Sequence, residues 1–218
     1  MDLSFIIKWL PLFGAAAWLT VSLAFVGVVV SVALGFLCAG IKYYRIPVLR
    51  ELVSVYVEVG RNTPLMIQLF FLYFGLPRLG ILLEGRTCAI VGLSFIGGAY
   101  MAEAIRGGLS AVGKNQTESG LSLGLSRLQL LRHVIMPQAM AVALPVIGAT
   151  AIFLLKETSV FSIVALPDLM YLAKDLLKEG HSAESNMMLV VAYLVIILPV
   201  SLFFAFLERR ARHAGFGA

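Results

Sequence analysis

Charge and cysteine are both scarce in this sequence, and their scarcity excludes whole classes of protein. Only 13% of the residues are charged, whereas 60% are hydrophobic, and the mean hydropathy is +0.95. A soluble domain has far more charged surface, so the composition predicts an integral membrane protein. The cysteines, Cys38 and Cys88, lie in or beside apolar runs without paired spacing, which argues against a disulfide or metal framework.

A phosphate-binding loop is also missing. No Gly-x-x-x-x-Gly-Lys-Ser/Thr pattern occurs, so the chain is not itself a P-loop ATPase. The sequence has no evident nucleophile–base pair or metal-ligand spacing, which disfavours an intramembrane hydrolase. The net charge of +5 comes from basic residues scattered between apolar runs, a distribution that fits membrane orientation and not nucleic-acid binding.

Long apolar runs predict an all-α membrane protein with five transmembrane helices in a single domain, residues 1–218. Pro11 and Gly14 are expected to separate a short interfacial piece from the first span. One side of the spans carries more cations than the other, so the N-terminus is expected outside and the C-terminus in the cytosol. The expected spans are residues 17–41, 48–76, 87–104, 138–155 and 186–207. The cytosolic cations are Lys42, Arg45, Arg50, Arg106, Lys114, Arg127, Arg132, Arg209, Arg210 and Arg212, and the external ones are Lys8, Arg78, Arg86, Lys174 and Lys178.

The second span is expected to carry ionisable residues near mid-membrane. Its apolar part, Thr63–Leu76, would cover only ~21 Å of the ~30 Å hydrocarbon core. The helix is therefore expected to extend back towards Val48, with a kink at Pro64. Glu58 and Arg61 would then pair along one face and border a wet cavity. The alternative is a short span from which Arg61 reaches the interface.

The segment after the fourth span is too short to cross again. The run Val160–Leu166 ends at Pro167, which suggests a partial or interfacial passage beside protein or a water-filled cavity. Glu157 just before it is a candidate cavity-lining residue, or alternatively a surface residue at a helix end. Pro167 and Asp168 are expected to open an amphipathic helix that ends at Gly180. Its apolar face would hold Leu169, Leu172 and Leu176.

A polar segment within residues 106–137 has the signals of a cytosolic helix pair. Asn115 with Glu118, and Ser126 with Gln129, have the spacing of capping boxes. Between them, Gly124 offers a left-handed residue that ends the first helix. Pro137 is expected to stop or kink the second helix. On these signals alone, an ordinary helical hairpin remains the alternative.

The same segment resembles the EAA loop of type I ABC importer permeases. Ser119 and Gly120 stand where that loop has two alanines, and Val134 and Met136 replace its Ile and Leu. The resemblance implies that the loop inserts into a cleft on a separate ATP-binding subunit. The coupling residues that it implies are Asn115, Glu118, Gly120, Gly124, Ser126 and Pro137.

Further motifs, spread from about residue 17 to 210, resemble the polar amino acid subfamily of these permeases. They are Arg61-Asn-Thr-Pro-Leu65, Gln68-Leu-Phe70, Tyr73-Phe-Gly-Leu-Pro77, Gly97-Gly-Ala-Tyr100, Glu103-x-x-Arg106, Pro137-Gln-Ala139, Ala143-Leu-Pro145 and Lys156-Glu-Thr-Ser159. Asn62 departs from the usual Gly. The resemblance implies a bacterial inner-membrane transporter that works with ATPase subunits, an external solute-binding protein and a second permease chain. ATP and Mg²⁺ would bind the ATPase, and no cofactor would bind this chain.

An amino acid brings an ammonium and a carboxylate, and each needs an oriented partner away from water. Glu157 is expected to neutralise the ammonium, while Thr63, Gln68 and the backbone freed by Pro64 bind the carboxylate or side chain. The other expected cavity residues are Asn62, Leu65, Met66, Leu69 and Tyr100. Glu103 with Arg106 is interpreted as structural, and the small residues Gly97, Gly98, Ala99 and Ala102 as helix-packing positions. The alternative function is a membrane anchor or regulatory subunit that recruits a cytosolic protein without moving solute.

Overall fold

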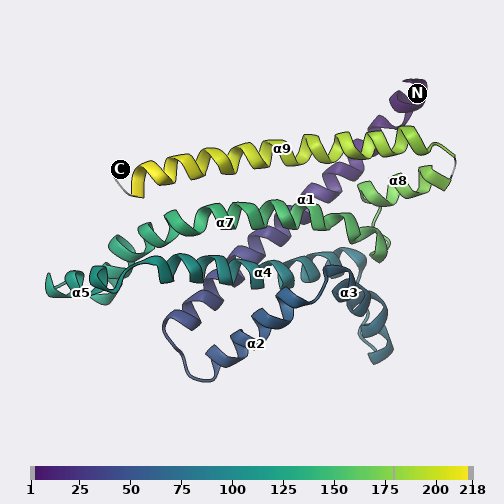
Figure 1. Ribbon diagram of the computed structural model, residues 1–218. Coiled ribbons are helices and arrows are strands. Elements are labelled where there is room, and N and C mark those ends of the chain that lie inside the picture. Colours follow the sequence, from purple (N-terminus) through teal and green to yellow (C-terminus); the bar gives the residue numbers. More distant parts are fainter. Residues whose placement is uncertain (1–2, 179, 216–218) are drawn as a thin grey trace.

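The computed structural model describes residues 3–178 and 180–215, and these contain helices but no strand. The side chains of residues 212–215 are not described, so the expected cytosolic cation Arg212 lies outside the description. Long helices lie side by side in an elongated bundle (Figure 1). The helices are α1 (Leu3–Tyr43), α2 (Leu49–Asn62), α3 (Leu65–Phe70), α4 (Gly85–Ala111), α5 (Lys114–Ser122), α6 (Arg127–Leu130), α7 (Met136–Glu157), α8 (Leu169–Lys178) and α9 (Ser182–Gly215). Short π or 3₁₀ turns extend them: η1 (Phe71–Gly75), η2 (Leu76–Leu79), η3 (Leu131–Ile135) and η4 (Thr158–Val164).

Helix α4 is the centre of the bundle and packs against α1, α2 and α7. Its small residues allow this close approach. A Cβ on Gly97 would lie 2.1 Å from Ser31 Oγ of α1, and one on Gly98 would lie 2.5 Å from the Tyr56 hydroxyl of α2. Ala99 and Ala102 are buried as well. The expectation that these four positions serve helix packing is confirmed.

The first helix is longer than expected. Pro11 lies inside α1, and Gly14 does not interrupt it, so the predicted division into an interfacial piece and a span is wrong. Packing explains the continuity, because Phe5 and Phe13 are buried in one cluster with residues of α8 and α9. These contacts hold the first turns in line with the rest of the helix despite the missing proline N–H.

The predicted second span is not one kinked helix. The chain leaves the helical conformation at Thr63, whose φ and ψ are −112° and 125°, and Pro64 then starts α3. The reason lies in local sterics: the ring of a proline disfavours the α conformation for the residue before it. The predicted second span is therefore two helices joined at an extended residue. Helix α2 packs on α4, and the Tyr56 hydroxyl donates a hydrogen bond of 2.8 Å to the Phe95 carbonyl.

Four helical segments are long and apolar enough to cross a membrane, among the described residues. They are Ser4–Tyr43, Gly85–Ala111, Arg127–Val164 and Ser182–Ala211, and a shorter apolar helical segment covers Leu65–Leu79. Helix α9 lies along the outside of the bundle (Figure 1). The most apolar stretch of α9 contains no buried residue, whereas 72% of the residues in the corresponding stretch of α4 are buried. Helix α9 is therefore a lipid-facing helix, and α4 is the central one.

After α7, the predicted amphipathic helix is present as α8, and the predicted partial passage stays a prediction. Turn η4 packs against α3 and α4, with Phe161 and Val164 buried. Asp168 Oδ1 accepts the Tyr171 N–H at 2.9 Å and caps α8. The apolar face of α8 buries Leu169 and Leu176, and Gly180 follows with a φ of +92°.

Candidate substrate cavity and coupling loop

At the break between α2 and α3, the backbone carbonyls of Arg61 and Thr63 accept hydrogen bonds from the side chains of Tyr100 and Gln68. The Gln68 amide donates a hydrogen bond of 3.1 Å to the Thr63 carbonyl and so holds the extended residue in place. The amide oxygen of Gln68 is buried and has no hydrogen-bond partner among the described residues. A buried acceptor without a partner is rare in folded proteins and marks a place where a polar ligand or a water would be stabilised.

Thr63 and Gln68 both line a cavity of about 520 Å³. Its other walls are apolar and come from α3, η1 and α4, namely Ile67, Phe71, Leu72, Val91, Gly92 and Phe95. A largely apolar cavity with a few polar groups is the usual form of a small-molecule site. Thr63 and Gln68 are thus the polar residues of the lining, but the surface of the cavity is almost entirely apolar, because the Gln68 amide oxygen is buried.

The other residues expected around this cavity do not line it. Leu65 and Leu69 are fully buried and pack on Gly92, where a Cβ would lie 2.8 Å from Leu69 Cδ2. Met66 is 47% exposed. Asn62 is exposed, and its amide donates to the backbone carbonyl and the carboxylate of Glu58. The two leucines therefore fix α3 on α4.

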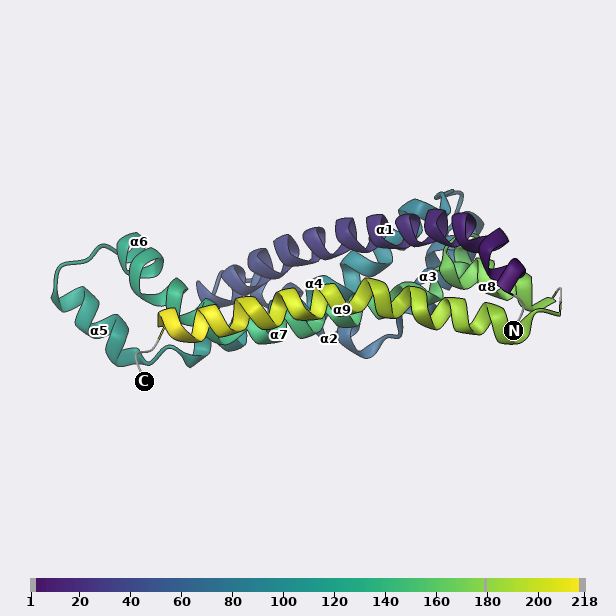
Figure 2. The same cartoon turned by 90° about the horizontal axis from the view of Figure 1, so that it is seen from above.

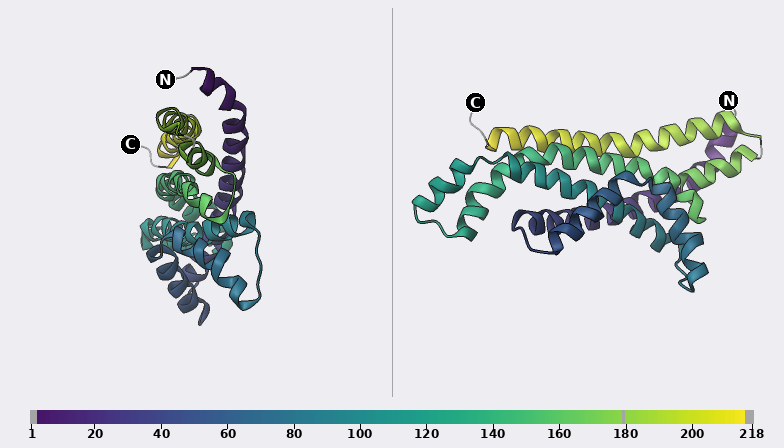
Figure 3. Two further views of the ribbon diagram at one scale, coloured as in Figure 1. Left: turned by 90° about the vertical axis from the view of Figure 1, so that its right-hand side faces the viewer. Right: turned by 60° about the horizontal axis from the view of Figure 1, so that its bottom comes forward.

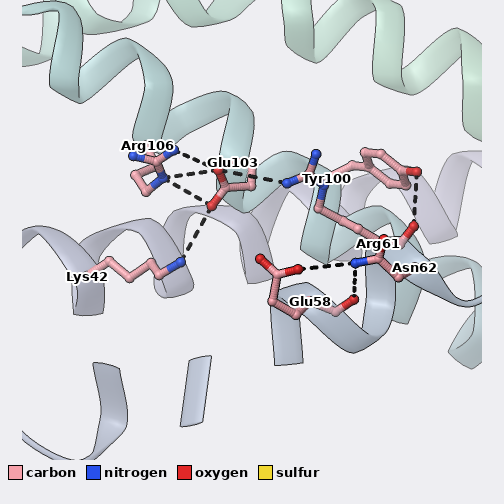
Figure 4. Close-up of polar contacts among 7 residues, drawn as sticks. All are labelled: Lys42, Glu58, Arg61, Asn62, Tyr100, Glu103 and Arg106. Carbon is pink, nitrogen blue, oxygen red and sulfur yellow. Dashed lines mark hydrogen bonds and ion pairs between the residues drawn. The ribbon is translucent and has the colours of Figure 1, made fainter. Parts of the chain in front are cut away.

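A second, charged cavity lies where α2, α4 and α7 meet. It measures about 380 Å³, and Arg61, Tyr100, Glu103 and Thr150 supply its polar lining. Arg61 faces Glu103 at 4.0 Å, so the expected Glu58–Arg61 pair gives way to a contact between helices (Figure 4). The reason is that α2 packs on α4, which presents Glu103 to Arg61, while Glu58 is occupied by Asn62.

Glu103 is the node of an ion-pair network across three helices. It accepts two hydrogen bonds from Arg106 Nε and one of 2.8 Å from Arg106 Nη2, and Lys42 Nζ of α1 lies 3.5 Å away. Three cations around one carboxylate leave a net positive cluster beside the cavity. The sequence interpretation covers only the Glu103–Arg106 pair, whereas the contacts of Glu103 with Lys42 and Arg61 come from other helices. The same-face spacing of Tyr100, Glu103 and Arg106 on one helix is the signal that places Glu103 at the cavity.

Tyr100 of α4 lines the charged cavity and contacts both α2 and α7. Its hydroxyl donates to the Arg61 carbonyl at 3.4 Å, and the Arg61 guanidinium lies 5.6 Å from its ring centre (Figure 4). The ring also packs edge-on against Phe153 of α7. Tyr100 thereby fixes the end of α2, next to the break, against α4 and α7.

Glu157 is the last residue of α7 and is half-buried. The turn η4 that follows it packs on α3, so the α7 end and the α3 helix belong to the same region. Thr158, next to it, is fully buried and bonds to the Leu155 carbonyl.

The α5–α6 segment, which we call the elbow (residues 114–130), projects past the ends of the long helices (Figure 3). The predicted capping box at Asn115 and Glu118 is wrong: α5 starts one residue after Gly113, so Asn115 is already inside the helix. Gly113 has the extended backbone of a helix start, and no side chain caps it. Glu118 is exposed on α5.

The turn of the elbow follows the prediction. Gly124 has a φ of +79°, and Ser126 and Gln129 form both hydrogen bonds of a capping box, at 2.9 and 3.3 Å. Gly120 is buried against α6, where a Cβ would lie 2.5 Å from Leu130 Cδ1. The two short helices are thus packed on each other at close range.

Pro137 does not stop the second helix. The helix continues from α6 through the wide turn η3 into α7, and Pro137 lies in the first turn of α7. The π-helical turn directly before it explains the continuity, because its altered register accommodates the missing N–H and the ring.

Comparisons with known proteins agree with this architecture. Residues 31–213 match the model of the family described as binding-protein-dependent transport system inner membrane component. The probable glutamine ABC transporter permease protein GlnP of Bacillus subtilis is 38% identical over 77% of this chain and 76% of its own length. The glutamine transport system permease protein GlnP of Escherichia coli K12 is 31% identical over 97% of this chain and 98% of its own length.

Solved structures give the same result. A crystal structure of an amino acid ABC transporter with histidines superposes with a TM-score of 0.89 at 33% identity, covering 96% of this chain and 99% of that one. An inward-facing MetNI methionine ABC transporter shares the fold, with a TM-score of 0.80 at 20% identity over 97% of this chain and 99% of that one. The chain therefore belongs to the binding-protein-dependent inner membrane components, the permease subunits of ABC importers, whose ATP hydrolysis is carried out by a separate subunit.

Proposed function

We propose that this permease carries a polar amino acid inward, received from an external solute-binding protein and driven by partner ATPase subunits. The similarity to glutamine permeases along nearly the whole chain carries this proposal. The alternative of a membrane anchor without transport is not favoured by membership of a family of transport components. ATP and Mg²⁺ belong to the partner in this proposal, and this chain binds no cofactor.

The proposed topology has five crossings, with the N-terminus outside. The second crossing is the broken pair α2–α3, whose extended residue is tolerated because it lies beside a cavity and the α4 helix. The elbow lies at the same end of the bundle as the end of α9, and α8 lies at the other end with the start of α1 (Figure 2). The cation-rich elbow end is the cytosolic one.

The proposed substrate path starts at the α2–α3 break. In this proposal, Thr63 and Gln68 bind the polar groups of the amino acid beside the apolar walls, and the buried amide oxygen of Gln68 becomes accessible when the substrate enters. Glu157 provides the negative charge for the ammonium, and Asn62, Met66 and Tyr100 border the path. Leu65 and Leu69 act through packing, since they hold α3 on α4.

The proposed coupling element is the elbow. Apolar side chains on it are exposed, including Leu123 at 83% and Leu128 at 73%, and such residues are suited to burial in a cleft of an ATPase. Asn115 and Glu118 lie on the exposed part of α5, while Gly120, Gly124 and Ser126 keep the two helices in a fixed arrangement. Pro137 lies where the elbow joins α7. A second permease chain, identical or related, completes the proposed assembly.

The direct test is uptake by vesicles that contain the permease, its ATPase and its solute-binding protein. We expect ATP-dependent accumulation of glutamine or another polar amino acid, and no accumulation with the non-hydrolysable nucleotide. Failure to accumulate any amino acid, with an intact and ATP-hydrolysing complex, would contradict the proposed substrate class.

Glu157→Gln tests the substrate residue in the same vesicles. Removing the charge should lower uptake at limiting substrate ~tenfold, because a charge-assisted hydrogen bond contributes ~1.5–3 kcal/mol. Glu84→Gln, an exposed residue at the start of α4, is the matched control and should transport normally. Unchanged uptake by Glu157→Gln would move this residue to a structural role.

Glu118→Lys tests the coupling residue. The side chain is exposed, so the protein should reach the membrane normally, while uptake falls at least ~tenfold and becomes uncoupled from ATP hydrolysis. Gln116→Lys places a lysine on another exposed position of α5 and serves as the control. Normal uptake in Glu118→Lys would refute the coupling assignment.

A further inference from the structure

A third cavity lies at the α8 end of the molecule, away from the proposed substrate path. It measures about 530 Å³ and is bordered by α1, the start of α4 and α8. Helix α1 supplies an apolar wall that includes Ala15, Leu19 and Leu23. Arg86 of α4 and Asp175 and Tyr171 of α8 give the cavity its polar rim. We call this cavity the outer groove.

The walls of the outer groove are held by contacts between distant parts of the chain. Gly85 starts α4 so close to η4 that a Cβ there would lie 2.3 Å from the Val164 carbonyl, and this approach brings Arg86 to α8. The buried Thr20 hydroxyl of α1 accepts the Leu169 N–H at 3.4 Å. The groove is therefore a preformed feature of the fold.

Arg86 is a cation without a counterion in the described part of the chain. It is exposed, and it makes no side-chain hydrogen bond or ion pair there. Asp175 is paired at 2.8 Å with Lys178, a residue whose side chain is 76% exposed. An exposed pair of this kind contributes little, so a ligand cation can replace Lys178 at Asp175.

Aromatic and apolar residues extend the groove along α1. Trp18 borders it and is 75% exposed, and Tyr171 on α8 is 37% exposed. Leu12, which also borders the groove, is 52% exposed. Tryptophan and tyrosine concentrate where a membrane protein meets lipid headgroups, and leucines below them face acyl chains. The groove thus joins a polar rim of both signs to an apolar wall open to the bilayer.

We propose that the outer groove binds a zwitterionic phospholipid with an ammonium headgroup. Its phosphate lies on Arg86, its ammonium on Asp175, and one acyl chain lies along the α1 wall. Arginine binds phosphate through charge-assisted hydrogen bonds, and a carboxylate binds an ammonium in the same way, so the two charges of the rim match the two charges of such a headgroup. The carboxylate of Asp175 disfavours a purely anionic lipid, and the α1 wall exceeds what a free amino acid would cover.

The test is lipid binding by the full-length permease in mild detergent, followed by native mass spectrometry with added phosphatidylethanolamine or phosphatidylglycerol. Phosphatidylethanolamine should bind more tightly. Arg86→Ala should weaken its binding ~tenfold, whereas Arg78→Ala, an exposed arginine on η2 outside the groove, should not change it. An equal loss in both variants would mean non-specific attraction and would overturn the proposal.

Two further variants separate the parts of the site. Ala15→Trp fills the groove from an exposed position of α1, so it should remove the bound lipid while the melting temperature stays normal. Asp175→Asn should abolish the preference for phosphatidylethanolamine over phosphatidylglycerol. Soluble glycerophosphoethanolamine should bind at least ~100-fold more weakly than the lipid, because the acyl contacts are missing. Equal binding of the soluble headgroup, or unchanged lipid binding in Ala15→Trp, would contradict a lipid site.

Discussion

The two ends of the molecule each start a short helix with a side-chain cap, but they do so in opposite environments (Figure 2). At the elbow, Ser126 is exposed enough to be solvated, and both bonds of its capping box join residues three apart. At the α8 end, Asp168 is fully buried, and only one of its carboxylate oxygens has a partner. The cap at Ser126 therefore involves only neighbouring residues of the elbow, whereas the cap at Asp168 is part of the buried core.

This difference has a mechanical consequence. The elbow is held by contacts within itself, such as Gly120 on Leu130, and the proposed coupling requires that it move as a unit relative to the bundle. The α8 end is tied to α1 through Thr20 and to the core through η4. A push on the elbow would thus be passed to α7, while the α8 end stays with the bundle.

The largest expected effect concerns Asp168. Burial raises the pKa of its carboxyl from 3.8 to about 6, so the folded protein binds this proton more tightly than the unfolded chain does. Its contribution to stability is full below pH ~4 and is lost as pH rises through ~6, a change of up to ~3 kcal/mol. Melting temperatures in detergent should therefore fall between pH 4 and pH 7 by more in the parent protein than in Asp168→Asn.

The control for this comparison is Asp175→Asn, because Asp175 is an exposed carboxylate of the same helix. This variant removes a carboxylate from a side chain that is 44% exposed, so its melting curves show what the loss of a charge does without a change at the buried cap. An Asp168→Asn variant with the same pH dependence as the parent would show that the buried cap does not titrate as its burial requires.

Local signals in the sequence predicted the elements that local contacts form. Gly124, Ser126 and Asp168 end or start helices where their spacing indicates, because each acts on backbone within a few residues. The error at Asn115 shows the limit of such signals. Two side chains at capping distance did not reveal that Gly113 would take the first position instead.

Tertiary contacts formed the features that the sequence did not predict. The pairing of Arg61 with Glu103 depends on how α2 packs on α4, and that packing depends on Gly98 admitting Tyr56. The continuity of α1 past Pro11 depends on Phe5 and Phe13 meeting α8 and α9. Apolar periodicity predicts that these helices exist, but not which side chains face one another across them.

Thr20 sharpens the comparison between the two ends of the molecule, because its hydroxyl joins α1 to α8, which are distant in sequence. Thr20→Val should destabilise the protein by ~1–2 kcal/mol, since the buried Leu169 N–H loses its acceptor. Thr150→Val is the matched control: its hydroxyl donates to the carbonyl one turn back, as Thr20 also does, but it makes no hydrogen bond to another helix among the described residues. Equal losses of thermal stability in the two variants would mean that the bond to α8 contributes nothing.

Ser126→Ala is expected to have the smallest effect, and a local one. Losing the cap should destabilise the start of α6 by ~1 kcal/mol, because the Gln129 N–H loses its acceptor. Hydrogen exchange should then become faster at residues 126–130, while the global melting temperature and exchange in α8 stay unchanged. The Ser126→Asp variant restores an acceptor and should return exchange towards the parent rate. If Ser126→Ala instead lowered the global melting temperature as much as Thr20→Val, the elbow would be coupled to the core, and the contrast between the two ends of the molecule would be wrong.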